Sequence, residues 1–197
     1  PAGETAIIHA ASTSDIDEQA ALLRGWNQTY EQISAGRFNG SFLETQIDCV
    51  QLFREVTSNS LQQTGALPEG TIAVGAPLSL HGSATFCGRS CNGQQLHVFS
   101  GKDQFDFFSP RGLDIVGFVL DESDLRSALT HDELEDVMPS LATPHLRFAD
   151  IAALNRMRAQ LQDTLSAVQS ASSQIGTASA EVASGANDLS ARTEQAA

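Results

Sequence analysis

The chain has 197 residues, of which 41% are hydrophobic and 18% charged, so we expect a folded domain with an appendage rather than a disordered protein. Its formal charge is −13, with Lys102 as the single lysine, so we expect no nucleic-acid binding by this chain alone. It contains no apolar run of the roughly eighteen residues that a membrane span needs, so we expect no membrane-spanning helix in this chain.

The cysteines and the N-terminus indicate the compartment. Cys49, Cys87 and Cys91 cannot all pair within one chain, and the spacing of the last two is neither a redox pair nor half of a common zinc motif. The sequence leaves open whether Cys87 and Cys91 act as a thiol pair or are small buried residues. The first residues lack the layout of a signal peptide. We therefore expect free thiols and a cytoplasmic protein.

The first part of the chain is predicted to be a helical lead, followed by a β-rich body. Residues 1–25 are polar, and Ser14 to Arg24 can form a short helix that Gly25 ends. From Trp26 onward, short segments alternate apolar and polar residues between turn-forming residues. The predicted strands are Thr29–Ile33, Gly40–Asp48, Val50–Thr57, Thr71–Val74, Gln95–Phe99, Gln104–Phe108 and Gly112–Leu120. This spacing is typical of an antiparallel sandwich or barrel, here over residues 26–148.

Helical character returns after the last predicted strand. The acidic run 121–136 is expected to be a solvated face, with a short helix at Ser123–Leu129. From residue 149 to residue 197 we expect one long helix of the coiled-coil type. Its apolar stripe follows a heptad spacing through Leu161, Leu165, Val168, Ser172, Ile175, Ser179, Val182, Ala186 and Leu189. Since Gly176 and Gly185 each weaken a helix by about 1 kcal/mol, we expect this helix to need a partner and the chain to form a homodimer.

The β-rich body resembles the N-terminal sensor domain of AraC-type transcriptional regulators, over about 26–165. The resemblance is carried by Tyr30–Gly40, Val50–Glu55, Gln63–Pro68, Phe105–Phe107, Pro110–Asp114 and, after the strands, Ala149–Arg158. It implies a cupin-like antiparallel β-barrel followed by a helix. Regulators of that family continue into two helix-turn-helix motifs, and none follows here, so DNA binding is not carried over.

The last part of the chain resembles the start of the signalling domain of methyl-accepting chemotaxis proteins, over about 166–197. The match runs through Ile175–Ala180, Glu181–Gly185 and Asp188–Gln195. The resemblance implies that Gln195 is a deamidation and methylation site, with Glu194 beside it. Methylation removes charge from a helix bundle and shifts its packing. Since the returning helix does not follow, we expect a truncated signalling helix.

The candidate chemistry is that of a binding site rather than of an active site. The five histidines are scattered, no nucleotide-binding or hydrolase motif is present, and we expect no metal, no cofactor and no catalytic residue. Alternation predicts a barrel interior filled by Leu43, Ile47, Leu52, Ile72, Val74 and Ile115. Arg54 shares the face of Leu52, while His97 and Phe99 share a face on another strand. These three residues are our candidate ligand-binding residues, with Arg54 receiving an anion.

The proposed binding site has one alternative interpretation, and the proposed function has two. Arg54 can instead form an ion pair with Glu55 or Asp48 at the barrel rim, with no ligand. For the whole chain we expect a non-enzymatic module that senses an unknown small molecule and signals through its helix. The first alternative is the sensor and dimerisation domain of an AraC-type regulator without its DNA-binding domain, and the second is a small cupin enzyme.

Overall fold

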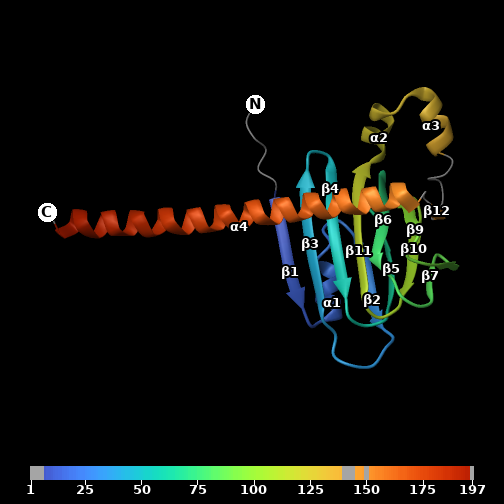
Figure 1. The fold of residues 1–197 in the computed structure, drawn as a ribbon, viewed down its shortest axis with the longest axis horizontal. Coiled ribbons are helices and arrows are strands. Elements are labelled where there is room, and N and C mark those ends of the chain that lie inside the picture. Colours follow the sequence, from blue (N-terminus) through green and yellow to red (C-terminus); the bar gives the residue numbers. More distant parts are fainter. Residues whose placement is uncertain (1–6, 139–144, 149–150, 196–197) are drawn as a thin grey trace.

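A computed structural model describes residues 7–138, 145–148 and 151–195 of the chain. These residues form twelve strands and four helices (Figure 1). The strands are β1 (Ile7–Thr13), β2 (Asn27–Gln32), β3 (Gly40–Ile47), β4 (Val50–Thr57), β5 (Leu61–Ala66), β6 (Thr71–Ser79), β7 (Ala84–Phe86), β8 (Arg89–Cys91), β9 (Gln95–Ser100), β10 (Gln104–Ser109), β11 (Leu113–Asp121) and β12 (His145–Phe148). The helices are α1 (Ile16–Ala21), α2 (Glu122–Ala128), α3 (His131–Val137) and α4 (Ile151–Gln195).

The strands form two antiparallel sheets that pack face to face. Sheet A has seven strands in the order β1-β3-β4-β11-β6-β9-β12, and sheet B has five in the order β2-β5-β10-β7-β8. The prediction of a mainly β protein with a C-terminal helix is confirmed. The prediction of a closed barrel is wrong, because each sheet keeps its own two edge strands among the described residues and the gap between the sheets is filled by side chains.

Aromatic rings fill the space between the two sheets. The main core cluster joins Phe42, Phe53 and Phe99 of sheet A to Phe86, Phe105 and Phe107 of sheet B. Trp26, just before β2, lies edge-on to Phe53, Phe99 and Phe105, with ring centroids 5.6–5.7 Å apart. Gly117 on β11 makes room for this packing, because a Cβ there would lie 2.5 Å from the ring of Phe53. The interior is therefore a packed core.

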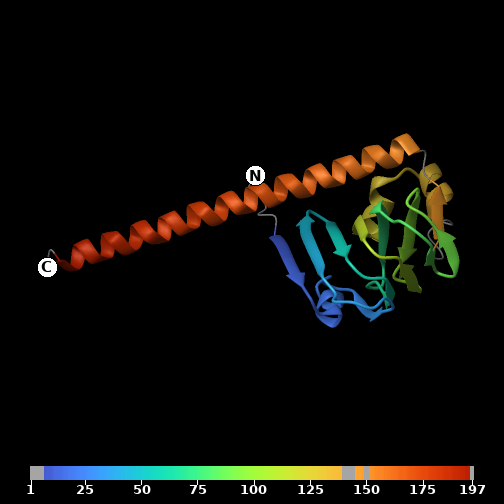
Figure 2. The same cartoon turned by 60° about the horizontal axis from the view of Figure 1, so that its bottom comes forward.

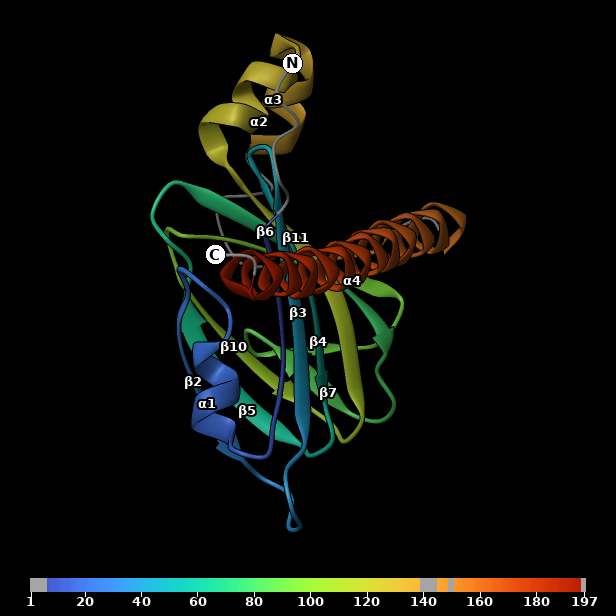
Figure 3. The same cartoon turned by 90° about the vertical axis from the view of Figure 1, so that its left-hand side faces the viewer.

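α4 lies across the outer face of sheet A (Figure 3), and an apolar cluster fills part of the space between them. Leu52, Val116 and Ala76 pack against Leu165 of the helix, with Met157 and Leu161 beside them. The spacing of 157, 161 and 165 puts the three side chains on one helical face. Farther along the sheet, Ile72 and Val74 contact Leu125 of α2.

This double burial corrects the predicted interior. Of the six side chains expected there, only Ile115 belongs to the cluster between the sheets. The other five are in the clusters covered by helices on the outer face: Leu43, Ile47, Leu52, Ile72 and Val74. Alternation assigns residues to two faces but does not tell which face is the interior when both are buried.

The N-terminal lead is part of the sandwich. β1 pairs with β3 along its whole length and is an edge strand of sheet A. Asp15 begins α1 by accepting hydrogen bonds from the backbone N–H groups of Asp17 and Glu18. Gln19 of this helix is buried, so α1 contributes a side chain to the core.

Candidate functional site

The structure divides the predicted site residues between the two faces of sheet A. Arg54 lies on the outer face of β4, beside the helix, whereas His97 and Phe99 lie between the sheets. They do not form one pocket. Glu194 and Gln195 are in the last turn of α4, where the structure describes the backbone only.

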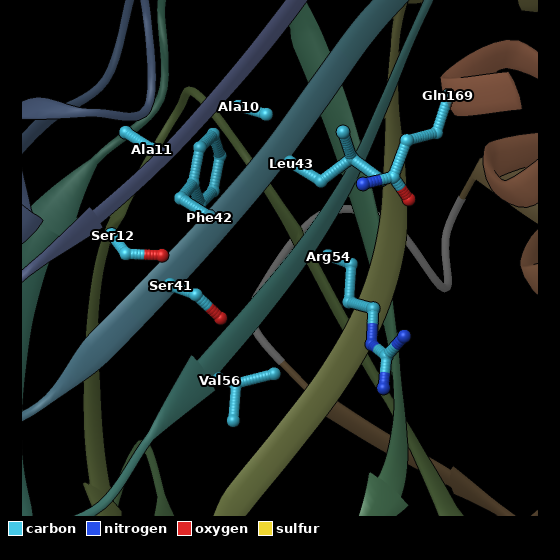
Figure 4. A pocket seen from close by; sticks show the side chains of 9 residues that line it. All are labelled: Ala10, Ala11, Ser12, Ser41, Phe42, Leu43, Arg54, Val56 and Gln169. Carbon is cyan, nitrogen blue, oxygen red and sulfur yellow. The ribbon is translucent and has the colours of Figure 1, made fainter. Parts of the chain in front are cut away.

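A groove of about 410 Å³ lies between the outer face of sheet A and α4. Figure 4 shows its polar lining, in which Arg54, Ser12 and Ser41 come from three adjacent strands and Gln169 reaches in from the helix. The register pairs Ser12 with Ser41, and Leu43 with Arg54, so these side chains share one face of the sheet. A small molecule bound here would contact the sheet and the helix at the same time.

The partner of Arg54 is neither of the two that we predicted. Its Nε and Nη2 atoms donate hydrogen bonds to the two carboxylate oxygens of Asp114 on β11, at 2.9 and 2.7 Å. Hydrogen bonding to Asp114 raises the pKa of Arg54. Glu55 lies on the opposite face, and the β3–β4 turn carries Asp48. An anion in the groove must therefore compete with Asp114 for the guanidinium.

His97 is a buried neutral ring in the core. It stacks on Phe86, with ring centroids 4.7 Å apart, and meets Phe107 edge-on at 4.8 Å. Its Nε2 atom is buried and has no hydrogen-bond partner among the described residues. Burial lowers the pKa of His97 to about 4, because the charged form loses its hydration. The ring is suited to packing and not to proton transfer near neutral pH.

Glu55 is the centre of a buried polar network that sequence reasoning missed. Its Oε1 atom accepts hydrogen bonds from the hydroxyl of Tyr30 at 2.9 Å and from Nε2 of Gln19 at 3.0 Å. Burial raises the pKa of Glu55 in spite of these donors and that of Gln63. Burial also raises the pKa of Tyr30, helped by the charge of Glu55. The signal in the sequence was the position of this glutamate. Phe53, Glu55 and Thr57 stand at every second position of β4 and therefore share its core face.

Among the described residues, the thiols and the scattered His, Asp and Glu side chains form no reactive cluster. Burial raises the pKa of Cys91 to about 11 and also raises that of Cys87, so neither is an activated thiolate. In residues 7–138, 145–148 and 151–195, no three side chains of His, Cys, Asp or Glu gather closely enough to hold a metal ion. Within the same ranges, no helix is both long and apolar enough to cross a membrane.

No family model matches the chain, and no solved structure was found to match it. The geometry of the groove and of α4 is therefore the basis for the functional proposal.

Proposed function

We propose that this chain is a non-enzymatic, cytoplasmic signal-transduction module, in which the β-sandwich senses a small molecule and α4 transmits the result to a partner helix. The single observation that carries the proposal is the division of α4 into two parts. One part packs on the sandwich, and the other part extends beyond it (Figure 2). In this second part the apolar side chains of Ile175 and Val182 are exposed.

The first part of α4 is fixed to the sandwich. Leu165 is 2% exposed against sheet A, and the guanidinium of Arg158 donates a hydrogen bond to the backbone carbonyl of Gly93 before β9. Full burial of one leucine contributes about 2 kcal/mol, so this anchoring holds the start of the helix in one position.

The second part of α4 continues the same heptad stripe, and the sandwich does not cover its described residues. The described side chains from Gln169 to Val182 are exposed, and Ile175 and Val182 are 59% and 72% exposed. Apolar side chains in heptad register are typical of a helix that pairs with another helix. The partner we propose is a second copy of this chain, because two copies present the same exposed stripe and can pair in heptad register.

The groove supplies a physical connection between sensing and output. Gln169 is the last groove residue and stands at the boundary between the two parts of α4. A ligand that contacts Arg54, Ser41 and Gln169 would change the balance between packed and released helix. The resemblance of Ile175–Gln195 to the methyl-accepting signalling helix supports the same direction of transmission, with Glu194 and Gln195 as the proposed adaptation sites.

One observation favours the alternative of an AraC-type sensor and dimerisation domain. In that reading the helix after the strands belongs to the sensor, and the packing of Met157 and Leu161 on sheet A agrees with it. The two proposals differ in what the exposed part of α4 does, and this part is the subject of the test.

The test is the oligomeric state of the full chain by sedimentation velocity over a range of concentrations. We expect a concentration-dependent dimer that the substitution Ile175→Asp abolishes, because it places a charge on the paired stripe. Gln174→Asp adds the same charge at the neighbouring exposed position and should leave the dimer intact. A monomer at every concentration, or equal loss with both variants, would contradict the proposal.

A further inference from the structure

A second cavity, of about 490 Å³, lies at the end of the sandwich where β11 leads into α2. Figure 1 shows this end of the fold. We call it the end pocket. It lies apart from the groove, and its wall combines residues of the α1–β2 loop, β3, β4, the start of β6 and the last three residues of β11. Its charged lining residues are Arg24, Glu44 and Asp121.

Glu44 is a buried carboxylate with one unsatisfied oxygen. Its side chain is 6% exposed, and its Oε1 atom accepts a hydrogen bond from Nε2 of Gln51 at 3.0 Å. Its Oε2 atom is enclosed and accepts no hydrogen bond from the described residues. The nearest cation is Nε of Arg24 at 3.5 Å, on a side chain that is 54% exposed. A half-paired buried carboxylate is costly, so a better donor would be held tightly.

Asp121 brings a second unused carboxylate to the same cavity. It is the N-cap residue of α2, yet its side chain makes no capping hydrogen bond. Asp and Asn at this position ordinarily bond to the first turn, so a carboxylate without that bond can accept one from a ligand. Two carboxylates against one arginine make the pocket negative, in a chain whose net charge is −13.

We propose that the end pocket binds a small organic cation with several N–H donors, a guanidinium or primary ammonium compound. The cation replaces Arg24 at Glu44, satisfies the Oε2 atom and reaches the carboxylate of Asp121. A planar guanidinium suits the carboxylate best, because it donates two parallel hydrogen bonds. The site is independent of helix pairing by α4, so it stands whether or not the function proposed above is correct.

Trp26, the single tryptophan, is a built-in reporter for this site. Its indole Nε1 donates to Oε1 of Gln51 at 3.4 Å, and Nε2 of Gln51 donates in turn to Glu44 and, at 3.1 Å, to the backbone carbonyl of Arg24. Movement of Arg24 or a new donor at Glu44 changes the surroundings of Gln51, and so changes the fluorescence of Trp26.

The experiment is a fluorescence titration of the full chain with butylguanidinium and with butylurea, which has the same shape and no charge. We expect a saturable change with butylguanidinium and at least about tenfold weaker binding of butylurea. Glu44→Gln keeps the shape of the side chain and should weaken butylguanidinium binding at least about tenfold. Arg24→Met removes the competing guanidinium and should strengthen it.

Two further variants make the result decisive. Asp121→Asn lies on the exposed rim and should weaken binding several-fold even if Glu44→Gln does not fold. Glu31→Gln removes one negative charge on β2, outside the pocket lining, and should leave binding unchanged. The proposal is overturned if butylguanidinium gives no saturable change, if butylurea binds equally well, if Arg24→Met weakens binding, or if neither carboxylate variant changes it.

Discussion

Arg54 and Asp114 form a bidentate ion pair across two adjacent strands on the outer face of sheet A, with N–O distances of 2.9 and 2.7 Å. The two side chains are 40% and 20% exposed, so water screens part of their attraction. The pair borders the groove under α4 and fixes the guanidinium that a ligand of the groove would meet. A stronger ion pair therefore stabilises sheet A, but it weakens the binding of an anion in the groove, because the anion must compete with Asp114.

Replacing Arg54 separates these two contributions. We expect Arg54→Met to lower the free energy of unfolding by about 1 kcal/mol or less, because the ion pair is partly exposed. The same variant should lose any thermal stabilisation that a small anion gives to the wild-type protein. Urea unfolding measures the change in the free energy of unfolding, and a thermal-shift screen of anions measures the stabilisation by a ligand. Asp114→Asn is the matched variant, because it also breaks the ion pair but keeps the guanidinium of Arg54. Stabilisation of wild type and Arg54→Met by the same anion would place the anion elsewhere.

The strands were largely predictable because their signal is local. All seven predicted strands are present, several with bounds shifted by a few residues. Five described strands were not predicted, namely β1, β5, β7, β8 and β12. Of these, β5 was missed because its residues Gln62, Gln63 and Thr64 are polar. Gln63 is nevertheless buried, in the network around Glu55, and only the three-dimensional structure provides the partner that makes this burial possible. Local pattern cannot show such a partner.

The candidate site was less predictable, since it depends on which face of sheet A is the interior. The pattern correctly put Arg54 on the face of Leu52, and that face is covered by α4 rather than by sheet B. The sequence pattern of β4 does not show that a helix more than a hundred residues later in the chain packs on this strand. The pairing of Arg54 with Asp114, 60 residues apart in the chain, was unpredictable for the same reason.

Because only the first part of α4 packs on the sandwich, we expect truncation of the second part and a substitution in the first part to change the free energy of unfolding by different amounts. A chain that ends at Gln169 keeps the packed side chains Met157, Leu161 and Leu165, so its free energy of unfolding should change by less than about 0.5 kcal/mol. Leu165→Ala leaves a cavity against sheet A and should cost about 2–4 kcal/mol. Urea unfolding followed by circular dichroism measures both. A large loss on truncation would show that the second part of α4 also stabilises the sandwich.

His97 predicts a loss of stability in mild acid. Its folded-state pKa of about 4 lies below the ordinary value of 6.5, so the unfolded chain binds more protons between these values. Stability from this group is complete above pH 6.5 and is lost as the pH falls toward 4. From about pH 7 to about pH 5 the loss should be about 2 kcal/mol. His97→Phe should remove it, since a phenyl ring fits the stack with Phe86 and has no proton to bind.

The control for this prediction is His131→Gln, because His131 is an exposed histidine of α3. Urea midpoints at the two pH values should differ less for His97→Phe than for the wild type and the control. Glu55 acts in the opposite direction, because its raised pKa makes stability fall as the pH rises above 4.5. The difference between wild type and His97→Phe isolates the histidine, since Glu55 is present in both. Identical pH dependence in the two proteins would contradict the burial of a neutral His97.

Helix pairing predicts a position-dependent crosslink on α4. With Cys49, Cys87 and Cys91 replaced, a cysteine introduced at Ile175 should form a disulfide across the dimer under mild oxidation, because a heptad seam places equivalent residues of two helices face to face. A cysteine at Gln174, one residue earlier and off the seam, should crosslink much less. Both positions are exposed in the single chain, so accessibility does not explain a difference. Equal crosslinking at the two positions, measured by non-reducing electrophoresis, would show that the exposed part of α4 meets its partner without a defined register.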